Sequence, residues 1–223
     1  MVFIVENEFQ VSLTVLGDGP NVPWKIIDIE ILVDDKDIGD GMPLVHNLQS
    51  CFILQLAQSR IDVSSSPLRE LYNILHAFAQ SLQLEVLYSQ VLKLCRERLG
   101  DHVTIEEYVL GRSLVLGYWK ELSASYPKAE LGYRLIISVD AADSTQPLSV
   151  LHQPPMSSEE ANQTGEGLKT NQFEKIMVHT IYLRSRNRLT GLREELELSL
   201  GSECTLGGSP PVLSIPILTP CLR

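Results

Sequence analysis

Hydrophobic and polar residues alternate at the start of the chain. Over residues 3–15, Phe, Val and Leu stand at almost every second position, with Glu, Gln, Ser and Thr between them. A period of two is typical of a half-buried strand. The turn-forming run GDGPN separates it from a second alternating run at 24–33. Three isoleucines of this second run are expected on one face: Ile27, Ile29 and Ile31. The pattern predicts a β-hairpin over residues 2–33.

The spacing of apolar residues then changes to three and four, as in amphipathic helices. The first predicted helix covers residues 43–61, and the second covers 67–99, where Ser66 can cap the helix and Pro67 suits its first position. The inward stripe of the first helix is expected to consist of Leu44, Leu48, Cys51, Phe52 and Leu56. That of the second is expected to consist of Leu71, Leu75, Phe78, Leu82, Leu87, Val91, Leu94 and Cys95.

Two details of the second helix follow from its sequence. Its stripe changes phase near Ser81–Gln83, which predicts a kink or a break there. Gly100 is expected to end the helix in the left-handed conformation. Cys51 and Cys95 lie on apolar stripes and are expected to be small buried hydrophobes.

Short β segments follow in direct succession, at 103–109, 113–120, 133–139 and 148–152. Antiparallel pairing is expected, because parallel strands need long crossovers. Strands and helices in separate runs indicate an α+β fold. We therefore expect an antiparallel hairpin and a short antiparallel sheet, packed with two to three long amphipathic helices, in one module over residues 1–152.

The remainder of the chain is expected to form a different region. Residues 153–171 are polar and predict a mobile loop. Residues 172–223 predict the start of a next module, with a helix over 172–198, a linker over 201–211 and an apolar edge strand. The candidate partner-contact surface lies in that strand and consists of Val212, Leu213, Ile215, Ile217 and Leu218.

The net charge of −10 disfavours general binding to phosphate backbones. Residues 1–40 hold nine acidic residues against Lys25 and Lys36, so this segment could steer a basic partner, although solubility alone also explains its charge. No apolar run approaches a membrane span, and the N-terminus lacks the basic region of a signal peptide. Four widely spaced cysteines suit a reducing compartment rather than a disulfide scaffold.

Sequence motifs for catalysis and metal binding are missing. The chain has no phosphate-binding loop, no dinucleotide fingerprint, no nucleophile elbow and no zinc-protease pattern. Its acidic run DDKDIGDG lacks the glycine and the final acid of a calcium loop at the required positions, and predicts a solvated turn. We therefore expect no enzyme activity, no cofactor and no metal site.

Two alternatives stay open. One is an enzyme whose site is assembled from scattered residues such as Asp101, His102 and Glu106. The other is a peptide-binding adaptor that adds a strand at an exposed edge such as Val212–Leu218. A deep polar pocket would favour the enzyme, and a broad apolar groove would favour an interaction protein.

Several segments resemble the central part of the Mediator of RNA polymerase II transcription subunit 14 family. Over Glu8–Asp101 they are EFQVSLTVLGD, VPWKIIDIEILVDDKDIGDG, LVHNLQ, SLQLEVLYSQ and RERLGD. The resemblance is weaker over Val103–His152 and returns with the helix near Phe173 and with PVLSIPILTPC.

This resemblance implies a scaffold in the nucleus, not an enzyme. Its expected partners are other Mediator subunits of the head, middle and tail modules, and indirectly RNA polymerase II and transcription activators. Neither direct nucleic-acid binding nor membrane binding is expected. The family's chains are much longer, so the sequence is expected to be a fragment without the N-terminal helical portion and the C-terminal repeats.

Overall fold

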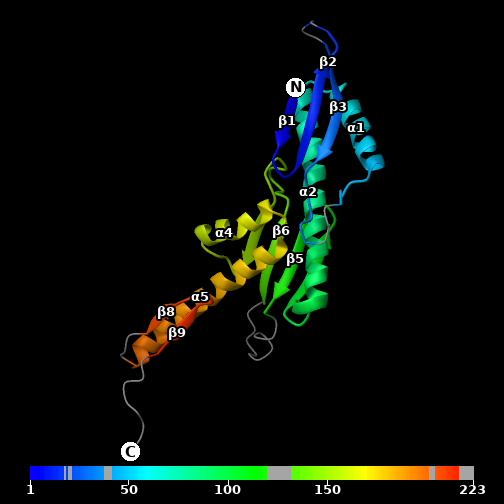
Figure 1. Cartoon of the computed structure of the whole chain (residues 1–223). Helices are drawn as coiled ribbons and strands as arrows, with labels where there is room; N and C mark the ends of the chain where they lie inside the picture. Colours follow the sequence, from blue (N-terminus) through cyan, green and yellow to red (C-terminus); the bar gives the residue numbers. More distant parts are fainter. Residues whose placement is uncertain (18, 20–21, 38–41, 120–131, 201–203, 216–223) are drawn as a thin grey trace, which may run out of the picture. The chain divides into compact units, whose positions relative to one another are not determined.

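The computed structural model forms two compact units, Met1–Glu174 and Lys175–Arg223. It describes all residues except 18, 20–21, 38–41, 120–131, 201–203 and 216–223. Helices and antiparallel sheets occur in separate runs (Figure 1), which confirms the predicted α+β class.

The first sheet has three antiparallel strands in the order β1-β2-β3. They are β1 (Val2–Val5), β2 (Phe9–Val15) and β3 (Trp24–Ile31). The hairpin predicted over 2–33 is therefore wrong in one respect, because its first strand is divided. The chain reverses at Asn7, which has a φ of 60°. Asparagine tolerates this left-handed conformation better than most residues, so a polar turn interrupts an otherwise alternating run.

A β-bulge changes which isoleucines of β3 are buried. Leu13 pairs with Ile26 and Ser12 pairs with Asp28, so Ile27 is an extra residue on its strand. Ile26 is buried, whereas Ile27 is 62% exposed. The prediction that Ile27 shares a buried face with Ile29 is wrong, because a bulge shifts the alternation by one residue.

Two helices pack on the first sheet: α1 (Asn47–Ile61) and α2 (Pro67–Leu94). A π-helical turn, η1 (Cys95–Leu99), continues α2, so the predicted extent of 67–99 is confirmed. Of the kink or break expected at Ser81–Gln83, the break is wrong, because α2 is continuous there, and the kink stays a prediction. Gly100 is also not left-handed, with a φ of −58°.

The buried face of α2 is largely the predicted one. Leu71 and Leu75 are buried in the first core with Phe9, Val11 and Ile53. Along the rest of the helix the buried apolar residues are Ala79, Leu84, Val86, Leu87, Val91 and Leu94. Because α2 contacts both β2 and β5, one helix supports two sheets, as Figure 1 shows.

The buried face of α1 differs from the prediction. Ile53, Ala57 and Ile61 face the core, whereas Leu48 and Phe52 are 75% and 66% exposed. Apolar residues occur on both sides of this helix, so their spacing alone does not select the inner face. Here the side with the small Ala57 is the one that packs inward, where α1 contacts α2.

The second sheet confirms the four predicted strands within one or two residues. They are β4 (Val103–Val109), β5 (Ser113–Tyr118), β6 (Tyr133–Ser138) and β7 (Ser149–Gln153). Neighbours in sequence are neighbours in the sheet, and all pairs are antiparallel. Alternate residues of β6 and of the first four residues of β5 are buried, as a sheet with one inner face requires.

A helix lies in the segment predicted to be a mobile loop over 153–171. This helix, α4 (Ser158–Lys169), contacts β7. It begins with a capping box, in which the side chains of Ser157 and Glu160 bond to each other's backbone N–H groups. The loop prediction is wrong because it followed the glycines and polar residues of this segment and not the capping box at its start.

The second unit contains most of α5 (Phe173–Leu200) and a small hairpin of β8 (Thr205–Gly207) and β9 (Val212–Ser214). The predicted helix over 172–198 is confirmed. The predicted linker over 201–211 contains β8, which pairs with β9, so that part of the prediction is wrong. No helix among the described residues is long and apolar enough to cross a membrane.

Candidate functional site

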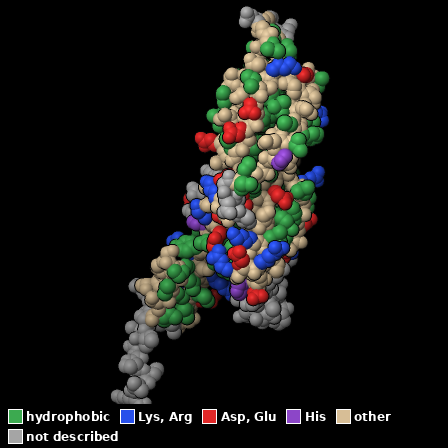
Figure 2. Space-filling view, turned by 45° about the vertical axis from the view of Figure 1, so that its right-hand side comes forward, with side chains coloured by type: hydrophobic (Ala, Val, Ile, Leu, Met, Phe, Trp, Pro, Cys, Tyr) green, Lys and Arg blue, Asp and Glu red, His purple; other side chains and the backbone are tan. Residues whose placement is uncertain are grey.

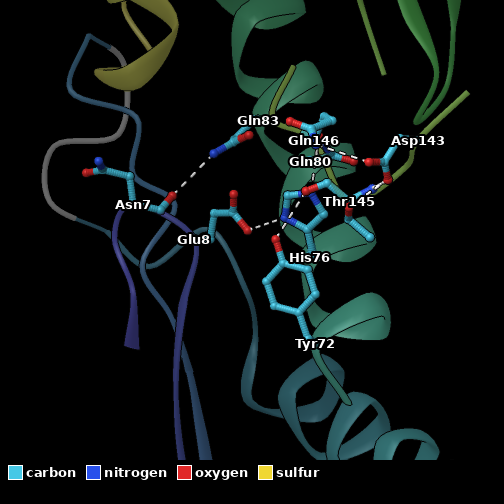
Figure 3. A network of polar contacts seen from close by, with 9 residues as sticks. All are labelled: Asn7, Glu8, Tyr72, His76, Gln80, Gln83, Asp143, Thr145 and Gln146. Carbon is cyan, nitrogen blue, oxygen red and sulfur yellow. Dashed lines mark hydrogen bonds and ion pairs between the residues drawn. The ribbon is translucent and has the colours of Figure 1, made fainter. Parts of the chain in front are cut away.

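A buried polar network connects the start of β2, the middle of α2 and the β6–β7 connection (Figure 3). Glu8 Oε2 lies 2.5 Å from His76 Nδ1, and His76 Nε2 lies 3.3 Å from the carbonyl oxygen of Gln146. Gln80 Nε2 donates to the same carbonyl at 2.6 Å. Both ring nitrogens of His76 therefore face acceptor oxygens, and its side chain is only 2% exposed.

The rim of this network is more accessible. Tyr72 stacks on the His76 ring and donates its hydroxyl to the carbonyl oxygen of Thr145 at 3.3 Å. Burial, with help from the charges of Glu8 and Asp143, raises the pKa of Tyr72. Hydrogen bonds from Thr145 and Gln146 lower the pKa of Asp143 to about 2. These polar groups bond to one another, so the network is suited to holding three segments together rather than to catalysis. We call the contacts of His76 with Glu8 and Gln146 the His76 clamp.

A second buried network is centred on Gln90 of α2. Its Nε2 donates to Asp35 Oδ1 and to the carbonyl oxygen of Asn171, both at 2.9 Å, and its Oε1 accepts from the Phe173 N–H at 2.8 Å. Asp35 is 5% exposed, so the predicted solvated turn is wrong at this residue. One amide thus ties the segment after β3 to the start of α5.

The outward side of α1 is the largest departure from the expected packing. We call the residues Leu48, Cys51, Phe52 and Leu56 the α1 outer face; all four are exposed. Cys51 was expected to be buried, and this expectation is wrong. Figure 2 turns the α1 side of the molecule forward and shows hydrophobic side chains along the upper part of this surface. Apolar side chains gathered on one exposed helix face are typical of an interaction site.

A groove of about 450 Å³ lies between β3 and the segment that leads into α1. Its apolar lining includes Ile29, Ile31, Met42, Pro43 and Leu44. Its acidic lining consists of Asp28, Glu30 and Asp34, which are all exposed. The groove therefore combines apolar walls with negative charge.

The side chain of Gln58 from α1 occupies one end of the β3 edge. Its Oε1 accepts from the Ile26 N–H at 2.9 Å, and its Nε2 donates to the Trp24 carbonyl oxygen at 3.1 Å. Gln58 also donates to Asp62 at 2.7 Å, and Asp62 pairs with Lys25 at 3.2 Å. These contacts fix α1 against the edge of the sheet.

The predicted partner-contact surface lies in the second unit. Val212 and Ile215 are 55% and 46% exposed, and Leu213 is half-buried in β9. Ile217 and Leu218 lie outside the described residues. The described part of this surface is thus partly exposed, and its role in contacts stays a prediction.

The residues of the enzyme alternative have simple surroundings. Asp101 and His102 are exposed at the start of β4. Glu106 of β4 accepts a hydrogen bond from Arg134 Nε of β6 at 2.6 Å, as an ion pair between two strands that β5 separates. Among the residues that the structure describes, no group of three or more His, Cys, Asp or Glu side chains could hold a metal ion.

Neither the His76 clamp nor the α1 outer face was predicted. Glu8 and His76 are 68 residues apart, and an isolated acid and an isolated histidine give no pairing signal. The sequence does contain a sign of the α1 outer face. The helix has more apolar residues than one buried face can hold, so some of them must be exposed.

Comparison with known proteins gives matches along the chain. Residues 95–173 match the family model described as Mediator of RNA polymerase II transcription subunit 14, RM2, and residues 174–223 match the Med14 RM domain.

Mediator of RNA polymerase II transcription subunit 14 of Aedes aegypti is 49% identical over 99% of this chain. The proteins of that name from Drosophila melanogaster and Homo sapiens are 46% and 39% identical over 99% and 98% of it. The chain covers only 14% to 15% of the length of these relatives.

Proposed function

The chain belongs to the Mediator subunit 14 family, and we propose that it is a structural interaction part of the Mediator coactivator complex rather than an enzyme. In this role it supports the regulation of transcription by RNA polymerase II, in the nucleus. The similarity to curated relatives extends over nearly the whole chain, including both sheets and α2, which supports a role carried by the fold itself.

The observation that carries this proposal is the α1 outer face. Buried Ile53 and Ala57 anchor one side of α1, while Leu48 and Phe52 leave the opposite side apolar and exposed. Interfaces between permanent partners are apolar at their centre, and large exposed side chains of this kind are covered there. We therefore assign the α1 outer face to contact with another Mediator subunit.

The proposed partners are subunits of the head, middle and tail modules, and indirectly RNA polymerase II and transcription activators. A second contact surface is proposed at Val212, Leu213 and Ile215, continuing to Ile217 and Leu218. The exposure of Val212 and Ile215 supports it.

Affinity purification of the tagged chain from nuclear extract tests the proposal. We expect the chain to recover Mediator subunits, and the double variant Leu48→Glu/Phe52→Glu to recover at least about fivefold less. The matched control is Leu110→Glu, which places the same charge on another side chain that is 72% exposed. Recovery of no Mediator subunit by the unaltered chain would contradict the proposed function.

A further inference from the structure

We propose that the open edge of β3 takes up an extended segment of another subunit, with alternating basic and apolar side chains, as an added strand. This inference rests on the scaffold function proposed above, because it specifies the kind of partner segment that such a scaffold binds. Strand addition combines backbone hydrogen bonds, which provide affinity, with side-chain pockets, which provide specificity.

The orientation of the β3 backbone is the first argument. The Leu32 N–H donates to the Glu8 carbonyl oxygen at 2.9 Å, so residue 32 faces β2. Facing and non-facing residues alternate in an antiparallel pair, and no register shift lies between Asp28 and Ile31. The N–H and C=O groups of Ile29 and Ile31 therefore point away from β2, toward the outer edge of the sheet.

Gln58 is the second argument. Its amide bonds to the Trp24 carbonyl and the Ile26 N–H, as a neighbouring strand would, and so closes that end of the edge. The groove begins just beyond, at Asp28, follows β3 to its end at Ile31 and continues to Asp34. The groove thus coincides with the part of the edge whose outward backbone groups bond to no residue that the structure describes. Backbone groups at such an edge are a template for another strand.

The side chains of the groove define the partner. Asp28 and Glu30 are exposed and two residues apart, so they share one face of β3. Opposite charges on directly facing strand positions attract, which favours Lys or Arg at every second position of the added strand. Its intervening side chains meet the apolar wall formed by Met42, Pro43 and Leu44. The expected partner pattern is therefore basic-apolar-basic-apolar.

A peptide titration of the complete 223-residue chain tests this assignment. The probe is an acetylated and amidated octapeptide of alternating Lys and Val, and the comparison peptide has Glu in place of Lys. We expect saturable binding of the Lys peptide in low salt, at least about tenfold tighter than that of the Glu peptide.

Two protein variants locate the site. Glu30→Lys should weaken binding of the Lys peptide by about tenfold, because it reverses one charge of the groove. The matched control is Glu107→Lys, which makes the same charge change at an exposed position of β4. Equal effects of the two variants would show attraction to net charge alone and would overturn the assignment.

N-methylation of the peptide tests strand pairing without altering the protein. Alternate amides of an added strand face β3, so methyl groups on one alternate set should weaken binding by about tenfold or more. Methyl groups on the other set should change binding by less than about threefold. Equal effects of both sets would overturn the added strand.

No binding of the Lys peptide up to about 1 mM would also overturn it. That result leaves the recovery of Mediator subunits through the α1 outer face unaffected, so the two failures are distinguishable.

Discussion

Single side chains connect parts of this chain that are far apart in sequence. His76 joins Glu8 to Gln146, and Gln90 joins Asp35 to the backbone of Asn171 and Phe173. A buried polar group that loses its partner is costly, so these contacts restrict the arrangements of the first unit more than apolar packing alone does. His76 and Gln90 both stand on α2, which therefore attaches four connections: β1–β2, β3–α1, β6–β7 and α4–α5.

Removing the Glu8 carboxylate tests how much the buried pair of Glu8 and His76 contributes to the stability of the fold. Glu8→Ala leaves the buried His76 Nδ1 without its partner and should lower the free energy of unfolding by about 1.5–3 kcal/mol. Urea denaturation measures this change. Glu6→Ala is the control, since Glu6 is exposed two residues away. Equal losses in both variants would show that the pair contributes nothing specific.

Leu75 tests the assignment of the buried α2 face. Its side chain is fully buried, so Leu75→Ala should lower the free energy of unfolding by about 2–5 kcal/mol, from lost burial and a remaining cavity. Leu48→Ala, at a position that is 75% exposed, should change it by less than about 0.5 kcal/mol. The same urea series compares the two, and a larger effect at Leu48 would contradict the α1 and α2 packing.

At the level of elements, the sequence predicts most strands and helices, but it does not always predict which of their faces is buried. The strands β4 to β7 follow from alternation, because each has one inner face and a short connection. The start of α4 could also be predicted, because Ser157 and Glu160 have the spacing of a capping box. Gly165 and Gly167, however, are typical of a loop. Which face of α1 is buried could not be predicted, because apolar residues lie on both sides of this helix.

Other features depend on contacts that no local pattern encodes. The bulge at Ile27 requires the pairing of β2 with β3, and the His76 clamp requires the β6–β7 connection to return to α2. The groove forms only when the segment before α1 lies beside β3. Acidic residues such as Asp28 and Glu30 look like surface charge in the sequence, and their common face appears only with the register of the strand.

The contact between β4 and α2 predicts a response to high pH. Tyr108 donates its hydroxyl to Glu85 Oε2 at 2.5 Å and stacks on Tyr88. Burial, together with Glu85, raises the pKa of Tyr108. The associated stability is present below the ordinary tyrosine pKa of about 10 and is lost as pH rises from there through the raised pKa.

Tyr108→Phe checks this linkage. The unaltered chain should lose stability above pH 10 more steeply than the variant, because the variant has no phenol to ionise at this position. Denaturation at several alkaline pH values, followed by circular dichroism, measures the slopes. Parallel slopes would contradict a linked Tyr108.

On the scale of the molecule, the first unit extends to Glu174 because α4 contacts β7 and Gln90 fixes the start of α5. The second unit, Lys175–Arg223, contains most of α5 and the β8–β9 hairpin. Each unit exposes apolar side chains, with Phe52 at 66% in the first and Val212 at 55% in the second. A scaffold segment is expected to cover such side chains with its partners.

Self-association of the isolated chain follows from this exposure. Sedimentation velocity at increasing concentration should show oligomers, and Leu48→Glu/Phe52→Glu should reduce them, because charges on the α1 outer face oppose its burial. Leu110→Glu should leave the oligomers unchanged. A chain that stays monomeric at high concentration would contradict this use of the α1 outer face.

The continuity of α2 also governs how the first unit melts. Leu71 and Leu75 belong to the core of the first sheet, while the later turns of the same helix contact β5 of the second. Heat absorption by residues 1–174 should therefore fit one cooperative transition, with equal calorimetric and van't Hoff enthalpies, rather than two separate ones. A helix that belongs to two cores cannot leave one of them and remain intact in the other.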